Sequence, residues 1–144
     1  MVLPMGKPEA VACVSGEGKL CGCVKFYAAG CGCLVAAEIR GLPESDTGFF
    51  AFHIHEGGDC GGTDFSDTGG HFNPEKQAHP RHAGDLPPLL SDHGTATLLV
   101  QTGRFTPRGV IGRTVVIHQN PDDFHTQSAG NAGRKIACGM IRRA

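Results

Sequence analysis

The sequence predicts an all-β protein, an eight-stranded Greek-key β-barrel or sandwich with two long functional loops. The 144 residues include 22 glycines and 9 prolines, no tryptophan and only 6% aromatic residues. This composition is typical of many turns and short strands rather than of long helices. Eight short runs alternate apolar with small or polar residues, and glycine-containing turns separate them, a pattern that favours a Greek-key sandwich or flattened barrel.

The first half of the chain predicts a hairpin, a third strand and a strand that carries histidines. Residues 11–15 and 20–27 alternate in polarity and are separated by the turn-like GEG, so they predict a hairpin. A turn at residues 28–30 leads into a third strand at residues 31–39. The polar segment LPESDTG then connects this strand to the run FFAFHIHE.

The second half predicts four more strands and contains most of the two long loops. Residues 86–90 predict a short edge strand, because two of them are prolines and proline cannot donate to a sheet ladder. Residues 56–84 and 119–134 remain without a predicted strand, and loops of that length are usually functional or disordered. The remaining strands are expected at residues 95–101, 110–118 and 135–141.

Length and charge limit the classes of protein that fit. A chain of 144 residues predicts a single domain, residues 1–144, with room for a sizeable core. The net charge of -1 argues against nucleic acid or an anionic membrane as a partner. There is no apolar window of about 18 residues and no recognisable signal peptide. We therefore expect a cytoplasmic protein, or an extracytoplasmic one if a signal was removed.

The histidines of the run FFAFHIHE begin a metal-ligating pattern. His53 and His55 flank Ile54, and alternate side chains of a strand share a face. Both imidazoles are therefore expected to point to one side, and Phe52 and Ile54 to the other. Two nitrogen ligands would then lie within reach of one ion.

A second group of ligand types follows in the next thirty residues. His71 comes after a glycine-rich loop, and His79, His82 and Asp85 follow at short intervals; three imidazoles and a carboxylate suit zinc. If His71 bonds one metal through each ring nitrogen, the two groups become one dinuclear site. The best candidate for the remaining ligand of the first ion is His118, and four imidazoles without sulfur suit Cu(II).

Five motifs occur in order, in a resemblance that extends from about Val11 to Met140: HIHEGGDC, GGHFNP, HAGDLP, IGRTVVIH and GNAGRKIACG. Together they resemble the copper/zinc superoxide dismutase family, whose fold is also a Greek-key barrel. The resemblance implies an oxidoreductase that converts superoxide, a small-anion substrate, to oxygen and hydrogen peroxide. It implies a copper ion and a zinc ion as cofactors, and it leaves a homodimer open.

The resemblance also assigns roles to residues. His71 matches the bridging imidazolate, which takes up a proton when its bond to copper breaks on reduction. Asp122 matches the carboxylate that hydrogen-bonds one histidine of each metal, and Cys60 and Cys138 match the structural disulfide. The implied copper ligands are His53, His55, His71 and His118, and the implied zinc ligands are His71, His79, His82 and Asp85.

Two positions depart from the family pattern. Only two residues separate His79 from His82, where many members have a longer insertion, and this puts the zinc affinity in question. Lys135 stands where the family has a guiding arginine, and Arg134 directly precedes it. Lysine keeps the charge but lacks the planar fork of arginine. We assign Lys135 a catalytic role in guiding the anion, with Arg134 as the alternative if the register is shifted by one residue.

Other features keep rival interpretations open. Lys135 and the seven cysteines favour one alternative interpretation, a non-catalytic or weakly active copper/zinc-binding protein. A structural module stabilised by zinc is a second alternative. The two CxC pairs are interpreted as small, strand-compatible residues, with a thiolate cluster for Cu(I) or Zn(II) as the alternative. These pairs are Cys21 with Cys23, expected to face outward, and Cys31 with Cys33. We expect the two histidines without a family role, His93 and His125, to be exposed in loops.

Overall fold

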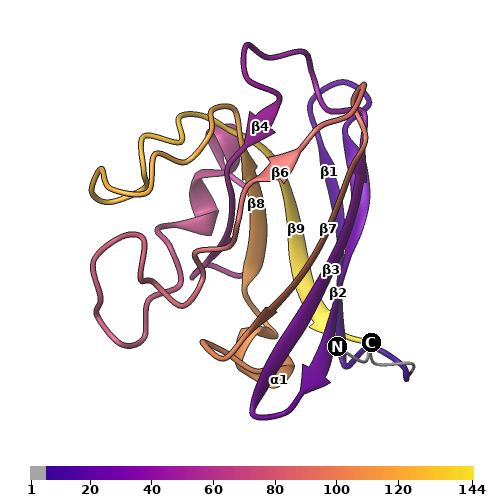
Figure 1. Ribbon diagram of the computed structural model, residues 1–144, viewed down its shortest axis with the longest axis vertical. Coiled ribbons are helices and arrows are strands. Elements are labelled where there is room, and N and C mark those ends of the chain that lie inside the picture. The colour runs from indigo at the N-terminus through magenta and orange to yellow at the C-terminus, as the bar shows by residue number, and fades with distance from the viewer. Residues whose placement is uncertain (1–5) are drawn as a thin grey trace.

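A computed structural model describes residues 6–144 of the protein, and a curled antiparallel sheet dominates it (Figure 1). The spatial order of its seven strands is β5-β8-β9-β1-β2-β3-β7, and β4 pairs with β6 in a separate two-stranded sheet. The strands are β1 (Ala10–Gly16), β2 (Cys21–Ala29), β3 (Gly32–Arg40), β4 (Phe49–Phe50), β5 (Phe52–His55), β6 (Leu89–Leu90), β7 (Ala96–Thr102), β8 (Thr114–His118) and β9 (Lys135–Arg143). The predicted all-β class is confirmed.

Residues 6–144 contain nine strands rather than eight, because the run FFAFHIHE divides at Ala51. Its first part pairs with β6 in the small sheet, and its second part pairs with β8 in the large one. The strand predicted at residues 86–90 shortens to Leu89–Leu90, after the two prolines. The predicted hairpin of β1 and β2 and the third strand are present, with bounds shifted by one or two residues.

The prediction of a strand over residues 110–118 was wrong in its first part. A short helix, α1 (Pro107–Val110), ends where that strand was expected to begin, and β8 starts only at Thr114. Thr106 caps this helix, since its side chain accepts a hydrogen bond from the backbone N–H of Gly109. Proline at the first helical position and threonine at the N-cap are ordinary helix-start signals that the strand pattern concealed.

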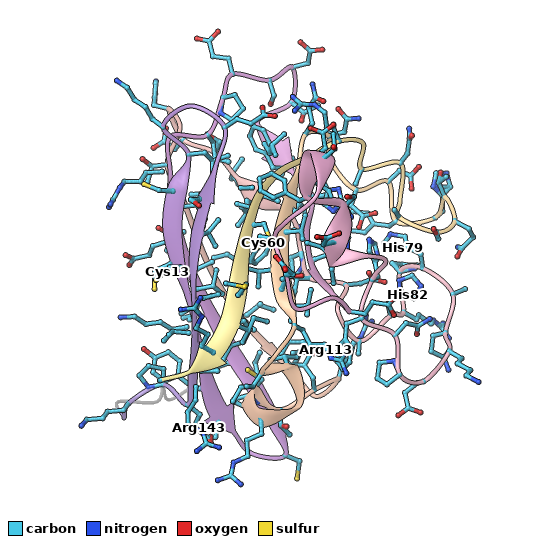
Figure 2. All side chains as sticks on the ribbon, turned by 180° about the vertical axis from the view of Figure 1, so that it is seen from behind. Cys13, Cys60, His79, His82, Arg113 and Arg143 are labelled. Carbon is cyan, nitrogen blue, oxygen red and sulfur yellow. A yellow bond between two sulfur atoms is a disulfide. The ribbon has the colours of Figure 1, made fainter. Side chains whose placement is uncertain are left out.

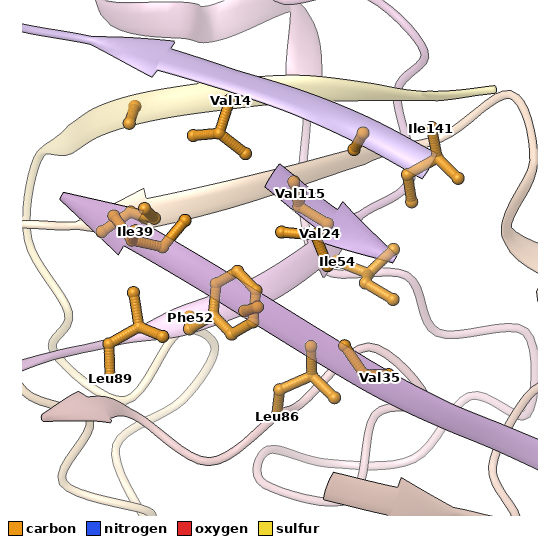
Figure 3. Close-up of a cluster of buried hydrophobic side chains, with 14 of the residues drawn as sticks. Val14, Val24, Val35, Ile39, Phe52, Ile54, Leu86, Leu89, Val115 and Ile141 are labelled. Atoms are coloured by element: carbon orange, nitrogen blue, oxygen red, sulfur yellow. The ribbon is translucent and has the colours of Figure 1, made fainter. Parts of the chain in front are cut away.

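Apolar side chains at alternate positions of the strands fill the interior of the protein. The same alternation determines the direction in which the histidines of β5 point. The core includes Val14, Val24 and Ile39 of the long strands and Phe52 and Ile54 of β5 (Figure 3). Phe52 and Ile54 are fully buried on the core side of β5, so the two histidines that alternate with them face away from the core. The expected orientation of this strand is therefore confirmed.

The first long loop contains a 3-10 helix, η1 (Thr63–Thr68), which was not predicted. Two residues of this segment, Asp64 and Phe65, have positive φ angles. No helix within residues 6–144 is long and apolar enough to cross a membrane.

Candidate metal centre

Three histidines converge from neighbouring strands. His53 and His55 lie on β5, and His118 ends β8, which pairs with β5. A register irregularity between Ile117 and His118 re-aims the last residue of β8. The Nε2 atoms of His55 and His118 lie 3.1 Å apart. With His71 these residues form a group whose ligand atoms all lie within 4.8 Å of one another, here called the strand cluster: His53, His55, His71 and His118.

The first long loop brings its ligands to the free edge of β5. Backbone hydrogen bonds join Phe72 N to the carbonyl of Ile54 (2.8 Å) and Ile54 N to the carbonyl of Gly84 (2.9 Å). These bonds satisfy the polar groups that an edge strand otherwise exposes. The loop thereby places four ligand-type residues beside the strand cluster. They form the loop cluster, which shares one histidine with the strand cluster: His71, His79, His82 and Asp85.

The atoms of the loop cluster face one another. His71 Nδ1 lies 2.8 Å from Asp85 Oδ1 and 3.0 Å from His82 Nδ1. His79 Nδ1 lies 3.1 Å from Asp85 Oδ2. Figure 2 shows His79 and His82 close together in a loop that projects from the sheets. Three imidazole nitrogens and a carboxylate therefore meet at one point, as a tetrahedral zinc site requires.

His71 belongs to both clusters through different atoms. Its Nδ1 faces the loop cluster, whereas its Nε2 is buried and has no hydrogen-bond partner within residues 6–144. His53 Nδ1 and His79 Nδ1 are also buried without a hydrogen bond among these residues, and His79 Nδ1 approaches Asp85 Oδ2 at 3.1 Å without forming one. Buried polar atoms are nearly always hydrogen-bonded, so three orphaned ring nitrogens in one site need another partner. Metal ions at the two clusters would satisfy them, and the donor set fits copper and zinc.

Burial keeps two histidines of the strand cluster, His55 and His118, neutral. Burial, together with the nearby His118, lowers the pKa of His55 well below its ordinary value. Burial, together with the nearby His53, lowers the pKa of His118 to about 3. Because a metal binds the lone pair of a neutral imidazole, both residues are held in the form that ligates.

Asp122 connects the two clusters, because its carboxylate contacts one histidine of each. Its Oδ2 lies 2.8 Å from His53 Nε2, and its Oδ1 lies 2.8 Å from His79 Nε2. Burial by itself would raise the pKa of Asp122, but the hydrogen bonds from His53, His79 and the backbone N–H of Phe124 hold that pKa well below its usual value. The anionic carboxylate thus fixes two ring orientations and leaves each Nδ1 free to face its cluster.

Two more histidines of the strand cluster, His55 and His118, are oriented by backbone carbonyls. His55 Nδ1 lies 2.8 Å from the oxygen of Gly69, and His118 Nδ1 lies 3.1 Å from the oxygen of Gly133. Gly130 has a φ of 67° and packs against Asp122 and His79, where a Cβ atom would clash with both side chains. Sequence reasoning singled out none of these three glycines.

The short segment between His79 and His82 is held by two residues that sequence reasoning missed. Arg104 donates from Nη1 to the carbonyls of Pro80 (2.9 Å) and His82 (3.1 Å). The side-chain amide of Gln127 accepts from the backbone N–H of His79 (2.9 Å) and donates to its carbonyl (2.8 Å). The two-residue spacing is therefore compatible with a loop cluster in which all ligands meet.

A third missed residue, Arg113, supports the start of the first long loop. Its Nη1 donates to the carbonyl of Glu56 at 3.0 Å, and its guanidinium lies 4.4 Å from the ring centroid of Phe72, which directly follows His71 in the chain. The sequence contains no local signal for these contacts, because they join residues far apart in the chain to backbone atoms and a ring face.

Lys135 lies beside the strand cluster, whereas Arg134 does not. Lys135 pairs with His118 across β8 and β9, and its Nζ donates to Thr68 Oγ1 (2.7 Å) and to the carbonyl of Gly69 (3.0 Å). That same carbonyl accepts from His55. Burial lowers the pKa of Lys135. Arg134 forms an ion pair with Glu17.

A disulfide joins Cys60 of the first long loop to Cys138 of β9, as the resemblance implied. The Cα atoms are 5.8 Å apart and the closed loop spans 78 residues. The loop that carries His71 is thus covalently tied to the large sheet. The rings of His93 and His125 are exposed and lie beside Asp92 and Asp123, as expected of loop histidines.

Comparison with known proteins places these observations in a family. A family model described as copper/zinc superoxide dismutase matches residues 20–141. The chain is 37% identical to Cu-Zn superoxide dismutase 3 of Arabidopsis thaliana, an alignment that covers 98% of this chain and 94% of the relative. It is 35% identical to Cu-Zn superoxide dismutase 2 of Aquifex aeolicus, covering 90% and 83%, and 34% identical to the Cu-Zn superoxide dismutase of Caulobacter vibrioides, covering 89% and 82%.

Proposed function

The chain belongs to the copper/zinc superoxide dismutase family and dismutes superoxide with copper and zinc as its cofactors, and we propose which of its residues perform each part of this reaction. The observation that carries the assignment is the position of His71, whose Nδ1 faces the loop cluster while its Nε2 is a buried atom without a partner among the described residues. An imidazole that can offer one nitrogen to each of two ions is what a dinuclear centre requires.

Copper is assigned to the strand cluster and zinc to the loop cluster. The strand cluster offers four imidazoles, a donor set that suits copper, and the loop cluster adds a carboxylate to three imidazoles, which suits zinc. The copper ligands are therefore His53, His55, His71 and His118. The zinc ligands are His71, His79, His82 and Asp85.

Bound copper supplies one-electron redox chemistry, by which one superoxide is oxidised to oxygen and a second is reduced to hydrogen peroxide. The residues of the chain handle protons and position. His71 is the residue that takes up and gives back a proton, at Nε2, while Nδ1 stays on the zinc side. Asp122 keeps the rings of His53 and His79 from rotating during this exchange.

Lys135 attracts the substrate. Its ammonium group is half-buried and shares the carbonyl of Gly69 with His55, so its charge acts next to the strand cluster. A cation in a partly desolvated position focuses the field that draws in an anion. Arg134 is engaged with Glu17, and this favours Lys135 as the guiding residue.

The assignment is tested by metal analysis combined with anomalous X-ray scattering at the copper and zinc edges and a superoxide assay. We expect one copper at the strand cluster, one zinc at the loop cluster, and activity that requires the copper. Full copper loading without activity would favour the alternative of a non-catalytic metal-binding protein. Zinc-loaded protein that fails to bind copper at His53, His55 and His118 would instead favour a structural module.

Several expectations concern the protein as a whole. A single domain over residues 1–144 is supported by one hydrophobic cluster that draws on both sheets of the described residues, with residues 1–5 outside that description. Three expectations stay predictions: that the protein forms a homodimer, that it is cytoplasmic or, if a signal was removed, extracytoplasmic, and that it binds neither nucleic acid nor a membrane. Sedimentation velocity of the metal-loaded protein tests the first of these.

A further inference from the structure

The outer face of the large sheet brings together two cysteines that no metal or disulfide assignment uses. Ala12 and Val14 of β1 point into the core, so Cys13 between them points outward; Val24 of β2 is also in the core, so Cys23 points outward too. The two are direct partners in the register of β1 and β2. Cys13 is exposed and Cys23 is half-buried, and both are free thiols.

The hydrogen-bond pattern fixes how close this pair is. Gly16 N donates to the carbonyl of Leu20 at 3.0 Å, which marks Gly16 and Leu20 as a hydrogen-bonded pair. Such pairs alternate along an antiparallel ladder, so Cys13 and Cys23, three positions further, form a non-hydrogen-bonded pair. The Cα atoms of such pairs are about 4.5 Å apart and their side chains lie closer than in hydrogen-bonded pairs. Disulfides span Cα distances of roughly 4.4–6.8 Å, so the strands need not move to form one.

The remaining free cysteines are placed differently. Cys21 faces Ser15 in the same register, Cys33 faces Ala28 and is buried in the core, and Cys31 lies outside the strands. Of the five free cysteines within residues 6–144, only Cys13 and Cys23 are partners across a ladder. A cluster of all four CxC thiols is excluded, because Cys33 points to the opposite face from Cys21 and Cys23.

We propose that Cys13 and Cys23 form a second, reversible disulfide, with hydrogen peroxide as its oxidant. The sulfur of Cys13 attacks one peroxide oxygen, the O–O bond breaks, and a sulfenic acid and one water result. The sulfur of Cys23 then attacks the sulfur of Cys13, the S–O bond breaks, and a second water leaves. Two thiols lose two electrons and two protons, and one peroxide becomes two waters.

The surroundings assign the order of these two steps. Cys13 is exposed and lines an open groove together with Arg142 and Arg143, so a small oxidant can reach its sulfur. Cys23 is half-buried, and burial, followed by the proximity of Cys13, raises the pKa of its thiol, so Cys23 is the less readily oxidised of the two and acts second. The oxidant is the product of the proposed function, so the pair lies on the surface of a protein that releases peroxide.

The test uses protein loaded with copper and zinc and treated with added hydrogen peroxide, alkylated, and digested with trypsin without reductant. Cleavage after Lys19 separates Cys13 from the peptide that ends at Lys25 and contains Cys21 and Cys23. We expect mass spectrometry to find these two peptides linked, and a reductant to separate them. A sample given catalase before the peroxide is expected to stay unlinked.

Two matched variants identify the bond. Cys23→Ser is expected to lose the linked peptides, and Cys21→Ser, two residues away on the same face, is expected to keep them. The proposal is overturned if Cys21→Ser loses the link, if Cys13 is found joined to Cys60 or Cys138, or if both thiols remain fully alkylated after peroxide treatment. Because peroxide is added as a reagent, each of these results is independent of dismutase activity.

Discussion

The two metal clusters are neighbours, but they are built in different ways. In the strand cluster, three of the four histidines sit on β5 and β8, and the residues that alternate with those of β5 belong to the core. In the loop cluster, every ligand lies on a segment with little regular structure. That segment is held by the edge of β5, by the disulfide, and by side-chain contacts of Arg104 and Gln127 to its backbone.

This difference indicates which cluster needs its metal in order to keep its ligands in place. Displacing His53 or His55 means disturbing a strand whose other face buries Phe52 and Ile54 completely, each a contribution of about 1.5–3 kcal/mol to folding. Displacing His79 or His82 means breaking a few polar contacts. We therefore expect the strand cluster to be largely preformed, and zinc binding to be coupled more strongly to the ordering of its loop.

His71 is the one residue that the two clusters share, so its substitution should weaken the binding of both metals. His71→Ala is expected to lower the affinity for both metals by more than the roughly 10- to 100-fold typical of losing an outer hydrogen-bond partner. Elemental analysis after dialysis measures both occupancies. His118→Ala is the control, and it should reduce copper while zinc is largely retained. Unchanged occupancies in His71→Ala would show that the imidazole does not bridge.

The disulfide ties the first long loop to β9, whereas β5 and β8 are held by strand pairing, so its loss should affect the two clusters unequally. In the chain-entropy model, closing a loop of 78 residues contributes about 4 kcal/mol. Cys60→Ser is expected to lower the free energy of unfolding by about that amount and to weaken zinc more than copper, as urea titration and metal competition measure. Cys31→Ser, at an exposed free cysteine, is the control and should change stability by less than about 0.5 kcal/mol. Equal losses at both metals would argue against a separate loop cluster.

The sequence could predict the parts of the site that depend on local periodicity. The orientation of His53 and His55 follows from the two-residue period of a strand, and the structure agrees with it. The division of the run FFAFHIHE at Ala51 was not predictable, because it depends on which distant strands pair with each part. Asp122 lies 69 residues from His53 and was identified only through the resemblance.

The missed residues show a second limit. Arg104 and Gln127 act on backbone atoms, and a backbone carbonyl carries no sequence signal of its own. The pairing of Cys13 with Cys23 likewise depends on the register of β1 and β2. A slip of one residue would turn one of the two side chains to the opposite face of the sheet. The sequence suggested pairs along each strand, whereas the close pair runs across two strands.

Asp122 holds a ring in each cluster, and its removal should measure how much each depends on that support. Asp122→Ala is expected to weaken zinc by about 10- to 100-fold. Copper should weaken less, because His53 is also fixed by its strand. Competition with chelators measures both constants. Asp123→Ala is the matched control, since that carboxylate bonds only to nearby residues of its own loop. A zinc constant unchanged by Asp122→Ala would remove this residue from the site.

The smallest effect is expected at Lys135, whose ammonium group donates to Thr68 and Gly69 and acts on the substrate through its charge. Lys135→Ala should lower kcat/KM severalfold and flatten its dependence on ionic strength, because one steering charge next to the strand cluster is lost. Lys135→Arg keeps the charge and adds a planar fork that can donate two parallel hydrogen bonds to a small anion, so it should leave kcat/KM equal or raise it. Stopped-flow superoxide decay over a range of salt concentrations measures both. Arg134→Ala is the decisive control: its guanidinium pairs with Glu17, so the rate and its salt dependence should hardly change, and the reverse result would transfer the guiding role to Arg134.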